Sequence, residues 1–189
     1  MRDVGLPQVT VAAFLAASRA GALPEGPRAE LVGGRVRPAP APSPRETVLL
    51  AYLAAQLRSD DVTRAGAQAV LGAAIRLGPW DLLRADAALF PAAAPGRTGA
   101  AVGVGGSFDA AAALLVVEVS RGRATHAERA PLYAASGVRE LWLVDAARGF
   151  TEALRSPWRG VYRSRTLWYP GEALRALALG VEVVPLPAP

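Results

Sequence analysis

The sequence predicts one α/β domain, residues 1–189, with a central mixed β-sheet flanked by helices. Two short runs dominated by Val and Leu, residues 114–119 and 140–145, have the length and composition of strands buried on both faces. Between them, residues 124–136 have the spacing of a helix, and Gly137 follows where a C-cap glycine is common. No internal repeat or linker divides the 189 residues, which suffice for one well-packed domain.

The N-terminal part is expected to form a helix followed by a hairpin. Residues 9–20 carry apolar side chains at helical spacing, and Gly21 is placed to end that helix. Residues 30–37 indicate two short strands joined by Gly33-Gly34, because glycine tolerates the positive φ angles of a tight hairpin turn.

A second helix is predicted to begin after a Pro-rich segment. Ser43 and Glu46 have the spacing of a capping box, in which each side chain bonds the backbone N–H of the other residue. The helix should run to about residue 58. One of its faces is apolar and consists of Val48, Leu49, Tyr52, Leu53 and Leu57.

Short apolar segments predict the remaining strands. Residues 67–77 indicate a strand that Gly78-Pro79 ends, and the strand after it contains Asp86. A loop rich in Gly, Ala and Pro, residues 91–110, is long enough to have a function. Further strands are expected near residues 150–155, 160–167 and 181–185.

Composition excludes several classes of protein. A hydrophobic fraction of 52% and a mean hydropathy of +0.24 exclude a disordered chain. The longest apolar stretches fall short of the roughly 18 residues that a membrane span needs. The N-terminus lacks the features of a signal peptide, so we expect a cytoplasmic protein without a membrane partner.

Cysteine and histidine usage limits the chemistry. The chain has no Cys, which excludes disulfides, thiolate zinc sites and a Cys nucleophile. His126 is the only His, and its place at the start of a helix predicts a solvated side chain. Any metal should therefore be held mainly by oxygen ligands, which suits Mg²⁺, Mn²⁺ or Ca²⁺.

The charge of the chain favours an anionic partner. A net charge of +5 and a pI of about 10.6 suggest nucleic acid, although all 21 basic residues are Arg, a bias that also fits a G+C-rich genome. In the C-terminal part, Arg alternates with aromatic residues. This alternation suits phosphate and base contacts, and equally a solvent-facing sheet surface. The residues are Arg155, Trp158, Arg159, Tyr162, Arg163, Arg165, Trp168 and Tyr169.

Two carboxylates interrupt apolar segments. Glu118 lies in the most apolar run, residues 114–119, where an ionised carboxylate must be paired, protonated or bound to a cation. Asp86 interrupts another apolar segment, and two such acids on neighbouring strands would form a site for a hard cation. The alternative is a structural ion pair with Arg129 or Arg121.

The order of these elements, together with two phrases, resembles the Uma-type family of the PD-(D/E)XK nuclease superfamily. The first phrase is residues 30–36, and the second is residues 133–145, which end in Leu143-Val144-Asp145. The resemblance covers roughly residues 8–186. Members of this family are uncharacterised bacterial proteins often labelled restriction endonucleases, so the resemblance implies a restriction-endonuclease-like core.

The resemblance also implies an activity and residue roles. It implies a metal-dependent endodeoxyribonuclease that hydrolyses phosphodiester bonds of DNA with Mg²⁺ or Mn²⁺. Asp86 matches the first metal ligand and Glu118 the second, with the Val119 carbonyl as a third. Glu30 matches an acid of the family that approaches the same metal through water.

The chain departs from the family pattern because it contains no Lys. The superfamily lysine falls on Ser120, and a lysine that the family often supplies from the next helix falls on Arg129. Arg129 could hold a phosphate oxygen, but arginine stays charged and cannot act as a general base. Glu46 stands where the family often has a His. The alternative function is a catalytically lapsed nuclease-fold protein that binds nucleic acid or a protein partner, and homodimer formation is left open.

Overall fold

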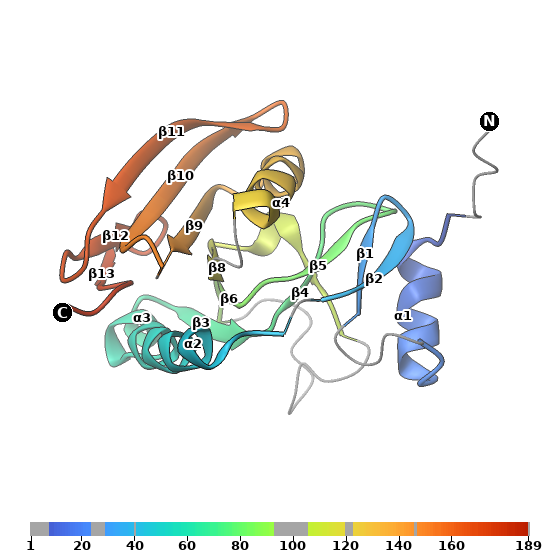
Figure 1. The fold of residues 1–189 in the computed structure, drawn as a ribbon, viewed down its shortest axis with the longest axis horizontal. Helices are drawn as coiled ribbons and strands as arrows, with labels where there is room; N and C mark the ends of the chain where they lie inside the picture. The colour runs from blue at the N-terminus through green and yellow to red at the C-terminus, as the bar shows by residue number, and fades with distance from the viewer. Residues whose placement is uncertain are drawn as a thin grey trace.

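A six-stranded mixed sheet forms the centre of the fold in the computed structural model (Figure 1). The structure describes residues 8–23, 29–39, 41–92, 106–119, 123–145 and 147–188. In the sheet the strands lie in the order β11-β10-β9-β8-β6-β3. Their bounds are β3 Ala67–Leu71, β6 Ala87–Pro91, β8 Leu115–Val119, β9 Glu140–Asp145, β10 Phe150–Trp158 and β11 Val161–Trp168.

The predicted strand-helix-strand unit at the centre is confirmed. β8 and β9 are parallel neighbours joined by α4 (Arg123–Ala135), whereas the other neighbours in this sheet pair antiparallel. Gly137 follows α4 with φ 83°, a conformation that glycine adopts without strain. α4 packs across β9, β10 and β11.

The two N-terminal helices also follow the sequence pattern. α1 (Val11–Arg19) begins at Thr10, whose side chain accepts a hydrogen bond from the amide of Ala13. α2 (Pro44–Leu57) begins with the predicted capping box of Ser43 and Glu46. Its apolar face is as predicted except at Val48, which is 71% exposed.

Two helices cover opposite faces of the central sheet (Figure 1). Successive residues of a strand point to opposite faces, so β8 contributes to both cores. Val117 packs with Leu53 of α2, and Val116 packs with Tyr133 of α4. Glu118 shares the face of Val116 and therefore lies under α4.

A second sheet lies beside α1 and carries the predicted hairpin (Figure 1). Its order is β2-β1-β5-β4-β7, and β1 pairs with β2 through a turn at Gly33 and Gly34, whose φ angles are 57° and 74°. The bounds are β1 Ala29–Val32, β2 Arg35–Pro38, β4 Ala74–Arg76, β5 Leu82–Arg84 and β7 Phe108–Asp109.

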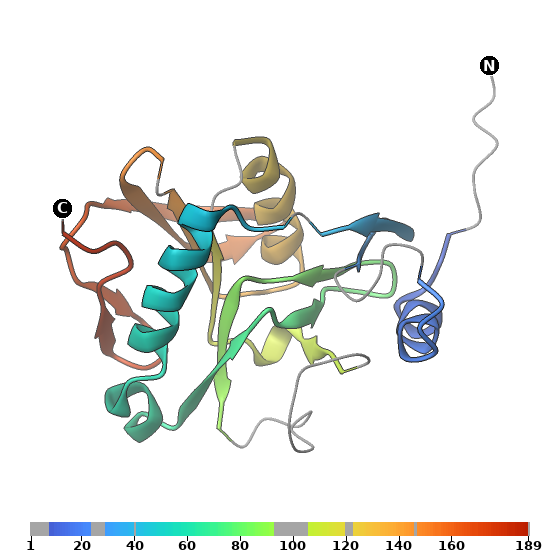
Figure 2. The same cartoon turned by 60° about the horizontal axis from the view of Figure 1, so that its bottom comes forward.

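Two strand predictions were wrong because the chain crosses between the sheets. Residues 67–77 form two strands, β3 and β4, and Gly72 lies at the break with φ 60°. Asp86 lies in the bend between β5 and β6 rather than inside a strand. The amide of Gly72 donates to the Asp86 carbonyl at 2.9 Å, so the crossings run side by side, as Figure 2 shows.

Some short elements were not predicted. They are α3 (Asp60–Arg64) and the strand β12 (Leu174–Ala176). β12 pairs with β13 (Val181–Val183), the strand predicted near residues 181–185. The predicted loop at residues 91–110 contains β7, and a 3₁₀ turn begins at Ala110. Residues 93–105 of this loop lie outside the described part of the chain. Among the described helices, none has the length and hydropathy to cross a membrane.

The capping box gives a test of the α2 boundary. Ser43→Ala removes the acceptor for the Glu46 amide and should lower the free energy of unfolding by about 1 kcal/mol, measured by urea denaturation. Ser43→Asp keeps a side-chain acceptor and is the control. Equal losses in both variants would contradict the assigned cap.

Candidate functional site

Asp86 and Glu118 come together where β6 begins and β8 ends. β6 and β8 are antiparallel, their last pair is Ala87 opposite Val117, and Asp86 and Glu118 are the next residues beyond it. The charge of Asp86 acts on Glu118, which shows that the two carboxylates are near each other. The amide of Val119 donates to Asp86 Oδ2 at 2.8 Å, which holds that carboxylate beside the end of β8.

Arg129 of α4 joins two of the predicted acids. Its guanidinium lies 2.9 Å from Glu118 Oε1 and 3.0 Å from Glu30 Oε1. It also donates to the Arg84 carbonyl at 2.7 Å. Glu118 is 1% exposed, and Glu30 and Arg129 are each 5% exposed. Thus the site includes Glu30 of β1, and the two sheets meet at this ion-pair network.

Tyr133 belongs to the site although the sequence analysis did not assign it a role. Its hydroxyl donates to Glu118 Oε1 at 2.6 Å, and its side chain is fully buried. Tyr133 is four residues after Arg129, so both side chains lie on the same helix face. The four-residue spacing from Arg129 was the feature of the sequence that could have identified Tyr133 as part of the site.

The environment of Glu118 disfavours its charged form. Burial is the main cause and raises the pKa of Glu118 to about 7, and the charges of Asp86 and Glu30 act in the same direction. The charge of Arg129 and the hydrogen bond from Tyr133 oppose this rise. Near neutral pH, Glu118 is therefore protonated to a larger extent than an exposed carboxylate would be.

The donor set fits a hard divalent cation. Asp86, Glu118 and Glu30 supply carboxylate oxygens, the ligands that Mg²⁺ and Mn²⁺ prefer. Within the described residues, no three acidic or histidine side chains already form a cation-binding group. Arg129 lies between Glu118 and Glu30, so the prediction of a cation site rests on the pair Asp86 and Glu118. The Val119 carbonyl as a third ligand stays a prediction.

A cavity of about 150 Å³ borders the site between α4 and the β1–β2 hairpin. Its wall includes Glu30 and Arg129, so these side chains contact a space open to a ligand. At its rim, Arg37 and Glu128 form an exposed ion pair at 2.6 Å. The other lining residues are Val32, Pro38, Leu83 and Leu132.

Other sequence-derived candidates lie elsewhere. Glu46 is a helix cap, as its simplest interpretation predicted. Ser120 and Arg121 lie outside the described residues. The prediction for His126 was wrong: the side chain is half-buried, and its Nε2 atom is buried without a hydrogen-bond partner in the described part of the chain.

Of the basic and aromatic residues in the C-terminal part, some are structural and others are exposed to solvent. Arg155 lies 2.7 Å from the buried Glu140 and is structural. Arg159 and Arg163 lie over the ring of Trp158, at 5.4 and 4.7 Å from its centre. Trp158 is 50% exposed. β11 has the alternating exposure expected of a solvent-facing surface.

Comparison with known proteins identifies the family. The profile of the Uma2 family, described as "Putative restriction endonuclease", matches residues 12–186. The chain belongs to the Uma2 family. A crystal structure of a putative nuclease of the DUF820 family from Anabaena variabilis superposes with a TM-score of 0.70. That protein is 16% identical, and the match covers 94% of this chain and 95% of the other. No functionally curated protein matches the sequence.

The comparisons confirm the nuclease-like fold and the family, and they leave the residue roles to be tested. The Uma2 match includes all of the predicted site residues: Glu30, Asp86, Glu118, Val119 and Arg129.

Loss of Arg129 should destabilise the protein strongly. Arg129→Met leaves two buried carboxylates without their cation, which typically costs about 3–5 kcal/mol. The loss should shrink towards pH 4, where the carboxylates take up protons. Urea denaturation at several pH values measures both effects. Arg165→Met is the matched control, because its pair with Glu152 is exposed and should contribute at most about 1 kcal/mol.

Glu118 should make stability fall with rising pH. Its pKa is raised from 4.5 to about 7, so its contribution to stability is full below pH 4.5 and lost as pH rises through 7. In EDTA, wild type should therefore lose more stability than Glu118→Gln between about pH 5 and pH 8. Parallel pH profiles for the two proteins would contradict the raised pKa. Glu128→Gln, an exposed acid, should follow the wild type.

Proposed function

We propose that this member of the Uma2 family is a Mg²⁺- or Mn²⁺-dependent endodeoxyribonuclease. The observation that carries the proposal is that three buried acids, Asp86, Glu118 and Glu30, meet where the two sheets join. Carboxylate oxygens are the ligands that Mg²⁺ and Mn²⁺ prefer.

The protein groups would act as follows. Asp86 and Glu118 would hold the cation from two neighbouring segments of the sheet, and Glu30 would reach it through water. When bound, the metal lowers the pKa of a water ligand and polarises the phosphate to be attacked. Arg129 borders the adjoining cavity and can place its planar set of N–H donors on a phosphate oxygen.

The absence of lysine changes how the water would be deprotonated. Arg129 stays protonated and therefore cannot take a proton from the water. Burial lowers the pKa of Arg129, but the charge of Glu118 and other nearby groups raises it above its ordinary value. Glu30 lines the cavity, and we propose that its carboxylate takes a proton from a water entering there.

DNA as the substrate is supported by charge. The chain carries a net charge of +5, and Arg159, Arg163 and Trp158 form an exposed group on the β10–β11 hairpin. Such a surface attracts phosphates and offers an aromatic face for bases.

One observation favours a second function, that of a lapsed nuclease fold that binds nucleic acid or a protein partner. Arg129 and Tyr133 already satisfy Glu118 Oε1 by hydrogen bonds and an ion pair. A network of this kind can persist for structural reasons after catalysis has been lost.

A cleavage assay separates the two functions. Purified protein is incubated with supercoiled plasmid and with linear DNA in Mg²⁺, in Mn²⁺ and in EDTA. Wild type should nick DNA only with metal, and Asp86→Asn and Glu118→Gln should each lower the rate by about 100-fold or more. Glu182→Gln, an exposed acid on β13, is the control and should keep wild-type activity.

The outcomes are distinct. Nicking that persists in EDTA or in both carboxylate variants would overturn the assigned site. DNA binding without nicking in either metal would support the lapsed alternative. In a parallel thermal denaturation experiment, Mn²⁺ should raise the melting temperature of wild type and not of Asp86→Asn, because preferential binding stabilises the folded state.

A further inference from the structure

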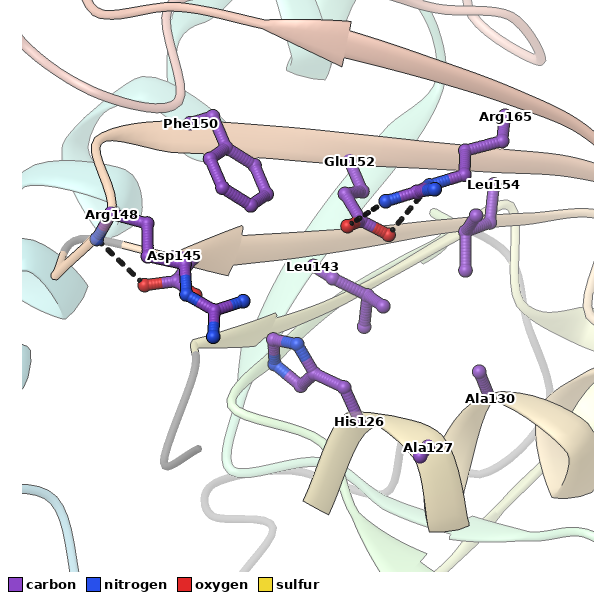
Figure 3. A pocket seen from close by; sticks show the side chains of 10 residues that line it. All are labelled: His126, Ala127, Ala130, Leu143, Asp145, Arg148, Phe150, Glu152, Leu154 and Arg165. Atoms are coloured by element: carbon purple, nitrogen blue, oxygen red, sulfur yellow. Dashed lines mark hydrogen bonds and ion pairs between the residues drawn. The ribbon is translucent and has the colours of Figure 1, made fainter. Parts of the chain in front are cut away.

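A second cavity, of about 360 Å³, lies between α4 and the central sheet (Figure 3). It is enclosed by the first turns of α4 and by β9, β10 and β11. Glu118 is opposite Leu143, and Leu143 is opposite Glu152 on β10. At a strand spacing of about 4.8 Å, Glu152 is therefore about 10 Å from Glu118 across the sheet.

The floor and one wall of this cavity are apolar. Leu143 and Leu154 are buried in the sheet below it, and Ala130 faces it from α4. The half-buried ring of Phe150 forms a wall, as Figure 3 shows. A flat aromatic ligand could stack on Phe150 and cover this apolar surface. The volume is near the lower end of the roughly 300–1,000 Å³ typical of small-molecule sites.

The charged groups of the cavity are already balanced. Asp145 accepts a hydrogen bond from the amide of Arg148, and the Arg148 side chain lies 3.7 Å from it. Glu152 receives two hydrogen bonds from Arg165, at 3.1 and 2.5 Å. Two acids matched by two arginines provide little net attraction for a phosphate or a metal ion. A neutral ligand with both donors and acceptors fits this arrangement better.

His126 supplies an unused polar group. Its ring projects from α4 towards Asp145 in Figure 3, and its buried Nε2 atom has no hydrogen-bond partner within the described chain. Burial lowers the pKa of His126, while the charges of Asp145, Glu152 and Asp86 oppose this effect and that of Arg129 adds to it. The His126 ring lines the cavity, so a ligand bound there would change the surroundings of the imidazole.

We propose that this cavity is a nucleobase-binding subsite. A nucleobase is planar, neutral and bordered by hydrogen-bond donors and acceptors. It would stack on Phe150, lie against the His126 ring and donate its N–H groups to Asp145 or Glu152. The inference rests on the proposed function in one respect: the base would belong to a strand whose phosphate lies at Asp86 and Glu118.

The single histidine makes the cavity observable without cleavage. His126 contributes the only imidazole signals of the protein, so NMR of these signals reports occupancy directly. The probes are the four deoxynucleoside 5′-monophosphates, added in EDTA, with deoxyribose 5-phosphate and inorganic phosphate as ligands that lack a base. At least one nucleotide should give a saturable shift of the His126 signals, and the two base-free ligands should give none.

Variants test whether the base occupies this cavity. Ala130→Met should obstruct the cavity and weaken nucleotide binding by tenfold or more, while its melting temperature shows that the protein is folded. Phe150→Leu, which removes the aromatic face, should weaken binding in the same direction. Glu182→Gln, an exposed acid on β13, is the control and should bind nucleotides like wild type.

Three results would overturn the proposal: no nucleotide shifts the His126 signals, deoxyribose 5-phosphate shifts them equally, or Ala130→Met binds like wild type. An inactive protein that still binds nucleotides at His126 would refute the nuclease proposal and leave the subsite standing. An active nuclease with no nucleotide effect at His126 would refute the subsite and leave the nuclease proposal standing. A 2-aminopurine-labelled single strand then tests whether a base within a strand occupies the cavity as a free nucleotide does.

Discussion

The structure around the candidate site depends on the buried contact between Glu118 and Arg129. Glu118 is in a strand whose other residues are apolar and buried, so its charge requires compensation from the helix above. Arg129 provides it and also joins Glu30 and the Arg84 carbonyl. Through this one guanidinium, the central sheet, α4 and the smaller sheet are held in a single arrangement.

The parallel β8-α4-β9 unit explains why functional groups gather on one face. A helix that connects parallel neighbours must lie over them, and α4 therefore directs side chains onto both strands. Arg129 and Tyr133 point to Glu118, whereas His126 and Ala130 point to the cavity over β9 and β10. One helix thus separates two sites that are neighbours on the sheet.

Replacing lysine by arginine has specific chemical consequences. Arginine offers more hydrogen bonds and keeps its charge, so it can hold two carboxylates in place or bind a phosphate. It cannot release a proton to take part in acid–base chemistry. A site built around Arg129 therefore stabilises charge well and transfers protons poorly. Membership of the Uma2 family agrees with the proposed nuclease activity.

The sequence alone determined α1, α2 and α4, the parallel strands β8 and β9, the Gly33-Gly34 turn and the candidate acids. These features depend on local patterns: apolar periodicity, caps, glycine at positive φ and a carboxylate among β-branched residues. The tertiary structure decided that residues 67–77 divide between two sheets and that the side chain of His126 lies in a cavity. It also showed that Tyr133 completes the carboxylate network. Those outcomes arise from contacts between residues far apart in the chain, such as Glu30 with Arg129, and no local pattern encodes which distant surfaces will meet.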